Sequence, residues 1–176
     1  MSKIVITGIT SFIGVHLAKY FSSNKCNVIG TISRDISQYE GIKKVRIVEA
    51  LNSKVKIEKL DITQSDELIN IISKAKPDYW IHHAGWATDY SSFEYNFVTG
   101  FEVNVKPLST LYPALKKCEC KGIIITGSSA EYAAAAGGRC VPRGATARTA
   151  TRHRPRRPAP KIRSPIRSIA HREQSL

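Results

Sequence analysis

Five short apolar runs occur in the first 126 residues of the chain, and longer stretches of mixed polarity separate them. The runs occupy residues 3–7, 27–32, 55–60, 78–82 and 122–126. Each is rich in Ile and Val and alternates only weakly between apolar and polar positions, which is typical of strands buried on both faces of a parallel sheet. We therefore predict five β-strands.

The segment between the first two runs has the spacing of an amphipathic helix. Ile13, Leu17, Tyr20 and Phe21 recur so that they fall on one face of a helix, opposite a polar face. This face is expected to pack on the sheet.

A second helix is predicted between the third and fourth runs. Thr63 is expected to be its N-cap, with Asp66 three residues further on, and Pro77 follows its end. The residues expected to face the core are Leu68, Ile71 and Ile72.

The fourth connection, over residues 99–118, contains Pro107 and Pro113. Because proline removes a helical hydrogen bond and clashes with the preceding turn, these residues are expected to kink the helix or split it in two. Strands that alternate with helices require right-handed crossovers, so the chain is predicted to form an α/β fold with a doubly wound parallel sheet.

The composition changes abruptly after Tyr132. Residues 133–176 contain ten Arg and one Lys against the single acid Glu173, so most of the net charge of +13 lies there. This Arg-, Pro- and Ala-rich segment has no aromatic residue and too little apolar area to form a core, so it is expected to be a disordered basic tail. The chain thus divides into a domain over residues 1–132 and a tail over residues 133–176, which is consistent with translation in a shifted reading frame.

No apolar run approaches the length needed to span a membrane, and the N-terminus lacks the features of a secretory signal. We therefore expect a cytoplasmic protein with reduced thiols. Cys118 and Cys120 are too close together, and too far from any His in sequence, to form half of a zinc site, so no metal site is predicted.

A glycine-rich turn follows the first strand and opens the first helix. It reads Thr7-Gly8-Ile9-Thr10-Ser11-Phe12-Ile13-Gly14. A tight turn needs Gly8, close packing of helix on strand favours Gly14, and the free N–H groups of the helix can bind a diphosphate. Ser11 takes the middle position, where glycine is usual. Together with the alternating strands, this turn predicts a Rossmann-like fold of five strands, incomplete at one edge.

The turn resembles the T-G-x-x-G-x-x-G fingerprint of the extended short-chain dehydrogenases, the NAD-dependent epimerase/dehydratase family that modifies sugar nucleotides. Further motifs follow in the family's order. They are Leu60-Asp61-Ile62, Ile81-His82-His83-Ala84-Gly85, Asn104-Val105 and Gly127-Ser128-Ser129-Ala130-Glu131-Tyr132. The sequence of the last motif is most similar to that of the GDP-4-keto-6-deoxymannose reductases.

This resemblance implies an NAD(P)-dependent oxidoreductase or epimerase/dehydratase domain that acts on a nucleotide-activated sugar. Ser129 would match the catalytic Ser/Thr, and Asp61 would lie beside the adenine. The cofactor-binding residues implied are Gly8, Thr10, Ser11, Phe12, Ile13, Gly14, Ser33, Arg34, Asp61, Ile62, His83, Ala84, Gly85, Ala87 and Asn104.

The choice of cofactor depends on the residues that follow the second strand. Arg34 can pair with a 2′-phosphate, helped by Ser33, which favours NADP(H). Alternatively, Asp35 accepts hydrogen bonds from the ribose of NAD(H). We favour NADP(H).

The catalytic Tyr and Lys of the family are missing. The Tyr is expected a couple of dozen residues after Ser129, yet no Tyr occurs beyond Tyr132. Two other pairs have the Tyr-x-x-x-Lys spacing, Tyr39 with Lys43 and Tyr112 with Lys116, but both precede Ser129 and are attributed to coincidence. We therefore expect a truncated, catalytically incomplete chain.

Two other functions remain open. The same fold can serve as a noncatalytic NADP-binding sensor, and the Arg-rich tail can tether the chain to nucleic acid or an anionic membrane. The tail lacks aromatic residues for base stacking, so any nucleic-acid binding is expected to be nonspecific and salt-dependent. A membrane partner is not expected either. The apolar fifth strand, Ile123-Ile124-Ile125, would lie at an uncovered sheet edge, which predicts self-association.

Overall fold

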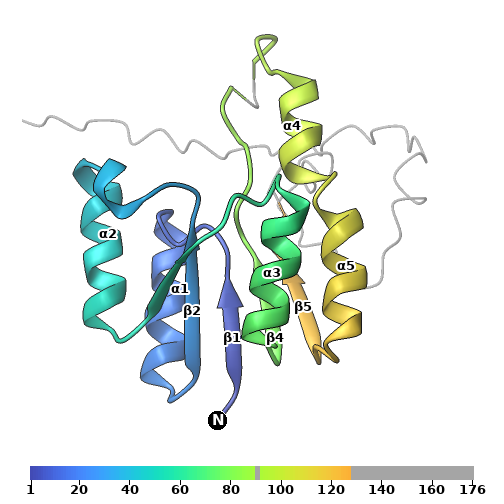
Figure 1. The fold of residues 1–176 in the computed structure, drawn as a ribbon. Helices are drawn as coiled ribbons and strands as arrows, with labels where there is room; N and C mark the ends of the chain where they lie inside the picture. Colours follow the sequence, from blue (N-terminus) through green and yellow to red (C-terminus); the bar gives the residue numbers. More distant parts are fainter. Residues whose placement is uncertain (90–91, 128–176) are drawn as a thin grey trace, which may run out of the picture. The chain divides into compact units, whose positions relative to one another are not determined.

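The computed structural model describes residues 1–89 and 92–127, and these form a five-stranded parallel sheet. The strands are β1 (Lys3–Ile6), β2 (Asn27–Ile32), β3 (Lys56–Lys59), β4 (Tyr79–His82) and β5 (Gly122–Ile125). Their order across the sheet is β3-β2-β1-β4-β5, with β1 at the centre (Figure 1). The prediction of a Rossmann-like doubly wound sheet is confirmed, and each predicted strand is present to within two residues.

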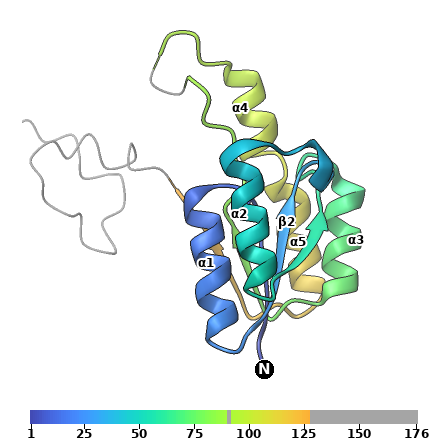
Figure 2. The same cartoon turned by 90° about the vertical axis from the view of Figure 1, so that its left-hand side faces the viewer.

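Helices cover both faces of the sheet. On one face α1 (Phe12–Ser23) and α2 (Gly41–Asn52) lie side by side (Figure 2). The apolar face predicted for α1 is wrong in part, because Leu17 and Phe21 pack against the core but Ile13 and Tyr20 are exposed. The buried residues of α1 are Gly14, Val15 and Ala18. On the other face α3 (Ser65–Ala75) packs against α5 (Leu108–Lys117). The short helices η1 (Ile36–Gln38) and α4 (Phe97–Asn104) complete the elements. The hydrophobic pattern did not predict α2, because Ile47 and Ala50 are its only buried residues.

The core consists of two apolar layers, one on each side of the sheet. Ile4 and Ile6 of β1 face the layer under α1 and α2, whereas Val5 between them faces the layer under α3 and α5. All three are at most 4% exposed. Since both faces of β1 are buried, its uninterrupted apolar sequence is explained.

The predicted N-cap of α3 is wrong. The helix begins at Ser65 with Gln64 as its N-cap, and the Gln64 side chain makes no capping hydrogen bond. The hydroxyl of Thr63 instead donates to Asp61 Oδ1 at 2.7 Å, so it is committed to the preceding turn. Asp66 and Glu67 in the first turn of α3 favour the positive end of the helix dipole.

The fourth connection is split as predicted, at one of its two prolines. Pro107 is the N-cap residue of α5, and the three residues from Val105 to Pro107 separate α4 from α5. Pro113 lies inside α5, which continues through it to Lys117. Pro107 therefore marks the boundary.

Among the described strands, β5 lies at one edge of the sheet beside β4, as predicted, and Ile124 and Ile125 are 55% and 42% exposed. Self-association through this strand remains a prediction.

No helix within the described ranges is long and apolar enough to cross a bilayer. Cys26, Cys118 and Cys120 are free thiols. The tail over residues 133–176 and the predicted boundary at Tyr132 lie outside the described residues.

Candidate functional site

A cavity of about 390 Å³ opens at the carboxyl ends of β1 to β4. In a doubly wound sheet, ligands bind at the carboxyl ends of the strands, where the strand order reverses. Here the order reverses between β1 and β4. The cavity is lined by Gly8, Thr10, Ser11, Thr31, Ile32, Ser33, Leu60, Asp61, Ile62, Thr63, His83, Ala84, Gly85 and Val103. Nine of the predicted cofactor-binding residues are among them.

The turn after β1 depends on the absence of a side chain at Gly8. Gly8 has a φ of +72°, and a Cβ there would lie 2.9 Å from the Cα of Ala84. Its carbonyl accepts the N–H of Ser11 at 3.2 Å, which closes the turn. Gly8 thus allows β1 and β4 to approach closely at the cavity.

Gly14 is equally constrained, although it lies under the turn and not on the cavity wall. A Cβ on Gly14 would collide with the carbonyl oxygen of Gly8 and would lie 2.9 Å from the Cα of Ile9. The turn therefore rests directly on the first turn of α1, as the predicted role of Gly14 requires.

The N-terminus of α1 opens toward the same end of the sheet. Ser11 is its N-cap, and the Ser11 hydroxyl oxygen accepts from the N–H of Gly14 at 2.8 Å. Within the described ranges the N–H groups of Phe12 and Ile13 have no acceptor, while their side chains are exposed. These two residues can contribute to an anion site through their backbone.

Sequence reasoning missed Thr7, which joins β1 to β4. Its buried hydroxyl oxygen accepts hydrogen bonds from the N–H groups of His83 and Ala84, each at 2.9 Å. The only sequence indication was a hydroxyl residue between the apolar strand and Gly8. Arg46 of α2 was also missed, and its guanidinium donates to the carbonyl of Thr10 at 2.9 Å.

The loop after β2 is organised by Tyr39. The Tyr39 hydroxyl accepts from the N–H groups of Ser33 and Arg34, at 3.1 and 3.2 Å. Asp35 is held separately, because Lys59 Nζ donates to both of its carboxylate oxygens at 3.2 and 3.1 Å. The loop thus leaves Arg34 exposed while Asp35 is paired.

Asp61 follows β3, and one of its two carboxylate oxygens already accepts hydrogen bonds within the protein. Its Oδ1 accepts from the N–H and the hydroxyl of Thr63, at 2.9 and 2.7 Å, and its own N–H donates to Glu67. Ile62 is buried beside it.

The loop after β4 is tied to α4. The N–H of Trp86 donates to Asn104 Oδ1 at 2.7 Å, and Asn104 Nδ2 donates back to the carbonyl of Trp86 at 2.9 Å. Asn104 therefore lies close to Gly85, and a Cβ added to Gly85 would be 3.0 Å from Asn104 Oδ1. Ala87, in the same loop, is exposed and does not line the cavity.

His82 and His83 occupy different environments. His82 is 4% exposed, and neither ring nitrogen has a partner among the described residues. Burial lowers the pKa of His82, with a smaller contribution from His83, and burial alone lowers the pKa of the half-buried His83. Burial therefore favours the neutral form of both rings.

The lowered pKa of His82 predicts a loss of stability in acid. An unfolded chain binds the His82 proton at its ordinary pKa of about 6.5, and the folded chain binds it less readily. The contribution of neutral His82 is therefore fully present above pH ~6.5 and is lost as the pH falls below it. Urea unfolding between pH 5 and 8 should show a shallower pH dependence for His82→Phe. The control is His16→Gln, at an exposed histidine of α1. An unchanged pH dependence in His82→Phe would contradict this account.

The predicted catalytic residue, Ser129, lies outside the described residues. Of the two tyrosines with a Lys four residues later, Tyr39 uses its hydroxyl to hold the loop after β2, and Tyr112 is half-exposed on α5. The described ranges contain no cluster of His, Cys, Asp or Glu that could hold a metal ion.

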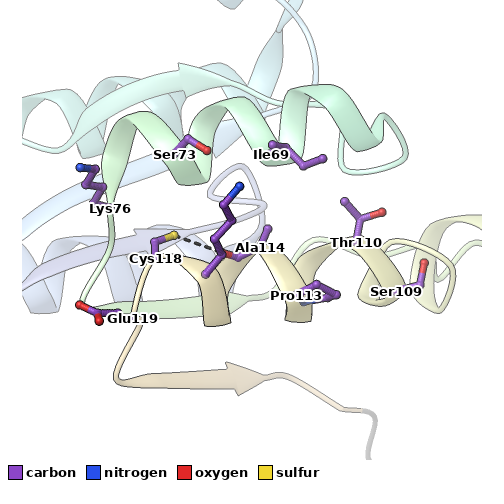
Figure 3. Close-up of a pocket in the computed structure, with 10 residues that line it drawn as sticks. Ile69, Ser73, Lys76, Ser109, Thr110, Pro113, Ala114, Cys118 and Glu119 are labelled. Atoms are coloured by element: carbon purple, nitrogen blue, oxygen red, sulfur yellow. Dashed lines mark hydrogen bonds between the residues drawn. The ribbon is translucent and has the colours of Figure 1, made fainter.

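A larger cavity of about 610 Å³ lies between α3 and α5, away from the strand ends (Figure 3). Figure 3 shows Ser73 and Ile69 of α3 opposite Thr110 and Pro113 of α5. The thiol of Cys118 donates to the carbonyl of Ala114 at 3.1 Å and is not aimed at another reactive group. We therefore place the functional site at the smaller cavity, where the glycine turn and the strand ends converge.

Comparison with known proteins shows which family shares this arrangement. The sequence pattern of the "NAD dependent epimerase/dehydratase family" matches residues 4–158. A UDP-glucose 4-epimerase of Pisum sativum is 32% identical over 132 residues, which cover 74% of this chain and 37% of the relative. The chain thus spans little more than a third of the length of the curated relatives it matches.

Solved structures share the fold at lower identity. The UDP-Glc/GlcNAc 4-epimerase of Campylobacter jejuni is similar with a TM-score of 0.62 and 18% identity, over 75% of this chain and 39% of that one. The protein BdcA, solved in complex with NADPH, is similar with a TM-score of 0.57 and 20% identity, over 73% of this chain and 52% of that one. With the family pattern matched from β1 to well beyond β5, the chain belongs to the NAD dependent epimerase/dehydratase family.

Proposed function

We propose that this chain carries the dinucleotide-binding portion of an NAD(P)-dependent enzyme that acts on a nucleotide-activated sugar. The observation that carries the proposal is the cavity at the strand ends, where the glycine turn leaves no room for a side chain at Gly8 or Gly14. The names of the matched relatives, UDP-glucose 4-epimerases, support the substrate class. The closer resemblance to GDP-4-keto-6-deoxymannose reductases remains a prediction.

The residues at this cavity fit a dinucleotide. The N–H groups of Phe12 and Ile13 are available to a diphosphate at the positive end of α1. Asp61 and Ile62 offer a carboxylate and an apolar surface to the adenosine portion. When bound, the nicotinamide would supply hydride transfer, and this chain's residues would bind and orient it.

The contacts after β2 favour NADP(H) over NAD(H). The carboxylate of Asp35 is paired with Lys59, so it competes poorly for the ribose hydroxyls of NAD(H). Arg34 lies next to it, with its backbone held by Tyr39. Its exposed guanidinium has no partner among the described residues and can pair with a 2′-phosphate in bidentate fashion.

Isothermal titration of the full chain tests the proposal. NADPH should bind more tightly than NADH, and Arg34→Ala should weaken NADPH binding about tenfold while leaving NADH binding unchanged, because it removes one charge-assisted contact. Lys54→Ala, at an exposed cation in the turn after α2, is the matched control. Equal weakening of both cofactors in Arg34→Ala would refute the 2′-phosphate contact. A failure to bind either cofactor would refute the proposed function.

We further propose that the chain binds the cofactor without completing the family's reaction. The position expected for the catalytic Tyr falls near Ala150, and no Tyr occurs beyond Tyr132. Loss of a general acid–base group lowers rates about 10²–10⁴-fold. Incubation with NAD⁺ and UDP-glucose should therefore yield no UDP-galactose above background, and turnover at the rate of an ordinary epimerase would contradict this.

A further inference from the structure

Two unusual residues of the cavity contact each other. Ser11 occupies the position of the turn where glycine is usual, and His83 lies 72 residues later at the end of β4. Ser11 Oγ and His83 Nε2 are 2.7 Å apart. The proposed diphosphate site at the start of α1 is therefore joined directly to a titratable ring.

The contacts of His83 Nδ1 indicate which of the two ring nitrogens carries the proton when the ring is neutral. His83 Nδ1 lies 2.9 Å from Thr126 Oγ1, and the Thr126 hydroxyl donates to the carbonyl of His82 at 3.3 Å. In the tautomer that fits this bond, Nδ1 donates to Thr126 Oγ1 in the neutral ring. His83 Nε2 then carries a lone pair and accepts from the hydroxyl of Ser11.

In this arrangement Ser11 donates its single hydroxyl proton to His83 Nε2. While His83 is neutral, that proton points at Nε2 and is unavailable to a ligand. When His83 gains a proton, both ring nitrogens become donors. Ser11 Oγ then accepts from both His83 Nε2 and the N–H of Gly14, and its own proton is released toward the cavity.

We propose that His83 is a positioning residue of the dinucleotide site: protonation of its ring turns the Ser11 hydroxyl toward the diphosphate, so that binding takes up a proton. The inference rests on the proposed function, because it requires that a dinucleotide occupies this cavity. A charge-assisted hydrogen bond from Ser11 to the diphosphate forms only in the protonated state. Binding therefore tightens as the pH falls.

The surroundings of His83 are suited to this coupling. The turn after β1 places the uncharged Ser11 against one ring nitrogen, and Thr126, which follows β5, lies against the other. Its titratable neighbours in the described part of the chain are His82, next to it on β4, and Asp61, across the cavity with Oδ1 committed to Thr63. The ring is neutral at rest because burial lowers its pKa, and an approaching diphosphate would favour its protonated form.

The test is isothermal titration of the full chain with NAD⁺ between pH 5.5 and 8.0. NAD⁺ is chosen because the 2′-phosphate of NADP⁺ would itself titrate near pH 6. The Kd should fall about tenfold from the upper to the lower pH, the effect of one charge-assisted hydrogen bond. In buffers of different ionisation enthalpy, binding should take up protons within this pH range.

Two variants separate the coupling from a general effect of pH. His83→Phe removes the titrating ring, and Ser11→Gly removes the hydroxyl and restores the usual residue of the turn. Both should bind NAD⁺ with a pH-independent Kd and without proton uptake. Both retain His82, so acid effects of His82 on stability are common to all three proteins.

Binding of NAD⁺ with the same pH dependence in the native chain and in His83→Phe would overturn the inference and leave the proposed function intact. Absence of NAD⁺ and NADPH binding at every pH would overturn both. Should the variants fail to fold, ¹⁵N NMR of the His83 ring in the free native chain shows which ring nitrogen carries the proton. A proton on Nδ1 supports the relay, and a proton on Nε2 overturns it.

Discussion

Replacing Gly8 by alanine should destabilise the chain by about 2–5 kcal/mol and abolish dinucleotide binding. The φ of +72° at Gly8 costs an alanine about 1–2 kcal/mol. In addition, the new Cβ would lie 2.9 Å from the Cα of Ala84 and 3.0 Å from its nitrogen. Overpacking against backbone costs about 1–3 kcal/mol more, because β1 and β4 must separate.

Gly41→Ala is the matched control for this experiment. Gly41 also has a positive φ, +53°, but no atom lies within 4 Å of the Cβ it would gain. Its loss of stability should therefore reflect the backbone conformation alone, about 1–2 kcal/mol, and cofactor binding should be retained. Urea unfolding and NADPH titration measure both quantities. Equal losses in the two variants would show that the approach of Gly8 to Ala84 is unimportant.

Thr7→Val should destabilise the chain by about 2–6 kcal/mol although it hardly changes the volume of the side chain. The Thr7 hydroxyl oxygen is the acceptor for two N–H groups, those of His83 and Ala84. Valine would leave both donors without this acceptor in a buried position, and each such loss costs about 1–3 kcal/mol.

Thr7→Ser separates the hydroxyl from the methyl group. It retains the acceptor and should lose only about 1 kcal/mol, for one buried methyl. Chemical denaturation of the two variants compares them directly. A Thr7→Ser protein as unstable as Thr7→Val would mean that packing of the methyl group, not hydrogen bonding, holds β1 against β4.

The features that sequence predicted are those encoded within a few neighbouring residues. The five strands could be located because short runs enriched in Ile and Val, bounded by polar segments, favour strands of a parallel sheet. Gly14 could be assigned because the atoms that leave no room for its Cβ belong to Gly8, Ile9 and Ser11, within six residues. Gly8 could be assigned from the positive φ that its turn requires, whereas its contact with Ala84, 76 residues later, is not contained in the pattern.

The features that sequence missed depend on contacts between distant segments. Thr7 accepts from residues 76 and 77 positions away, and Ser11 contacts a ring 72 positions away. No spacing rule relates such residues. The predicted N-cap of α3 failed for a local reason, because the Thr63 hydroxyl is held in the preceding turn, where it donates to Asp61 two residues earlier.

The central place of β1 in the sheet determines when the protein can begin to fold on the ribosome. β1 precedes its sheet neighbour β4 in the chain, and the N–H of Lys3 is bound by the carboxylate of Asp78, 75 residues later. At a synthesis rate of about 5–20 residues per second, several seconds pass before that partner exists. Throughout this interval the apolar strand β1 has one open edge, so its protection falls to chaperones and not to the native fold.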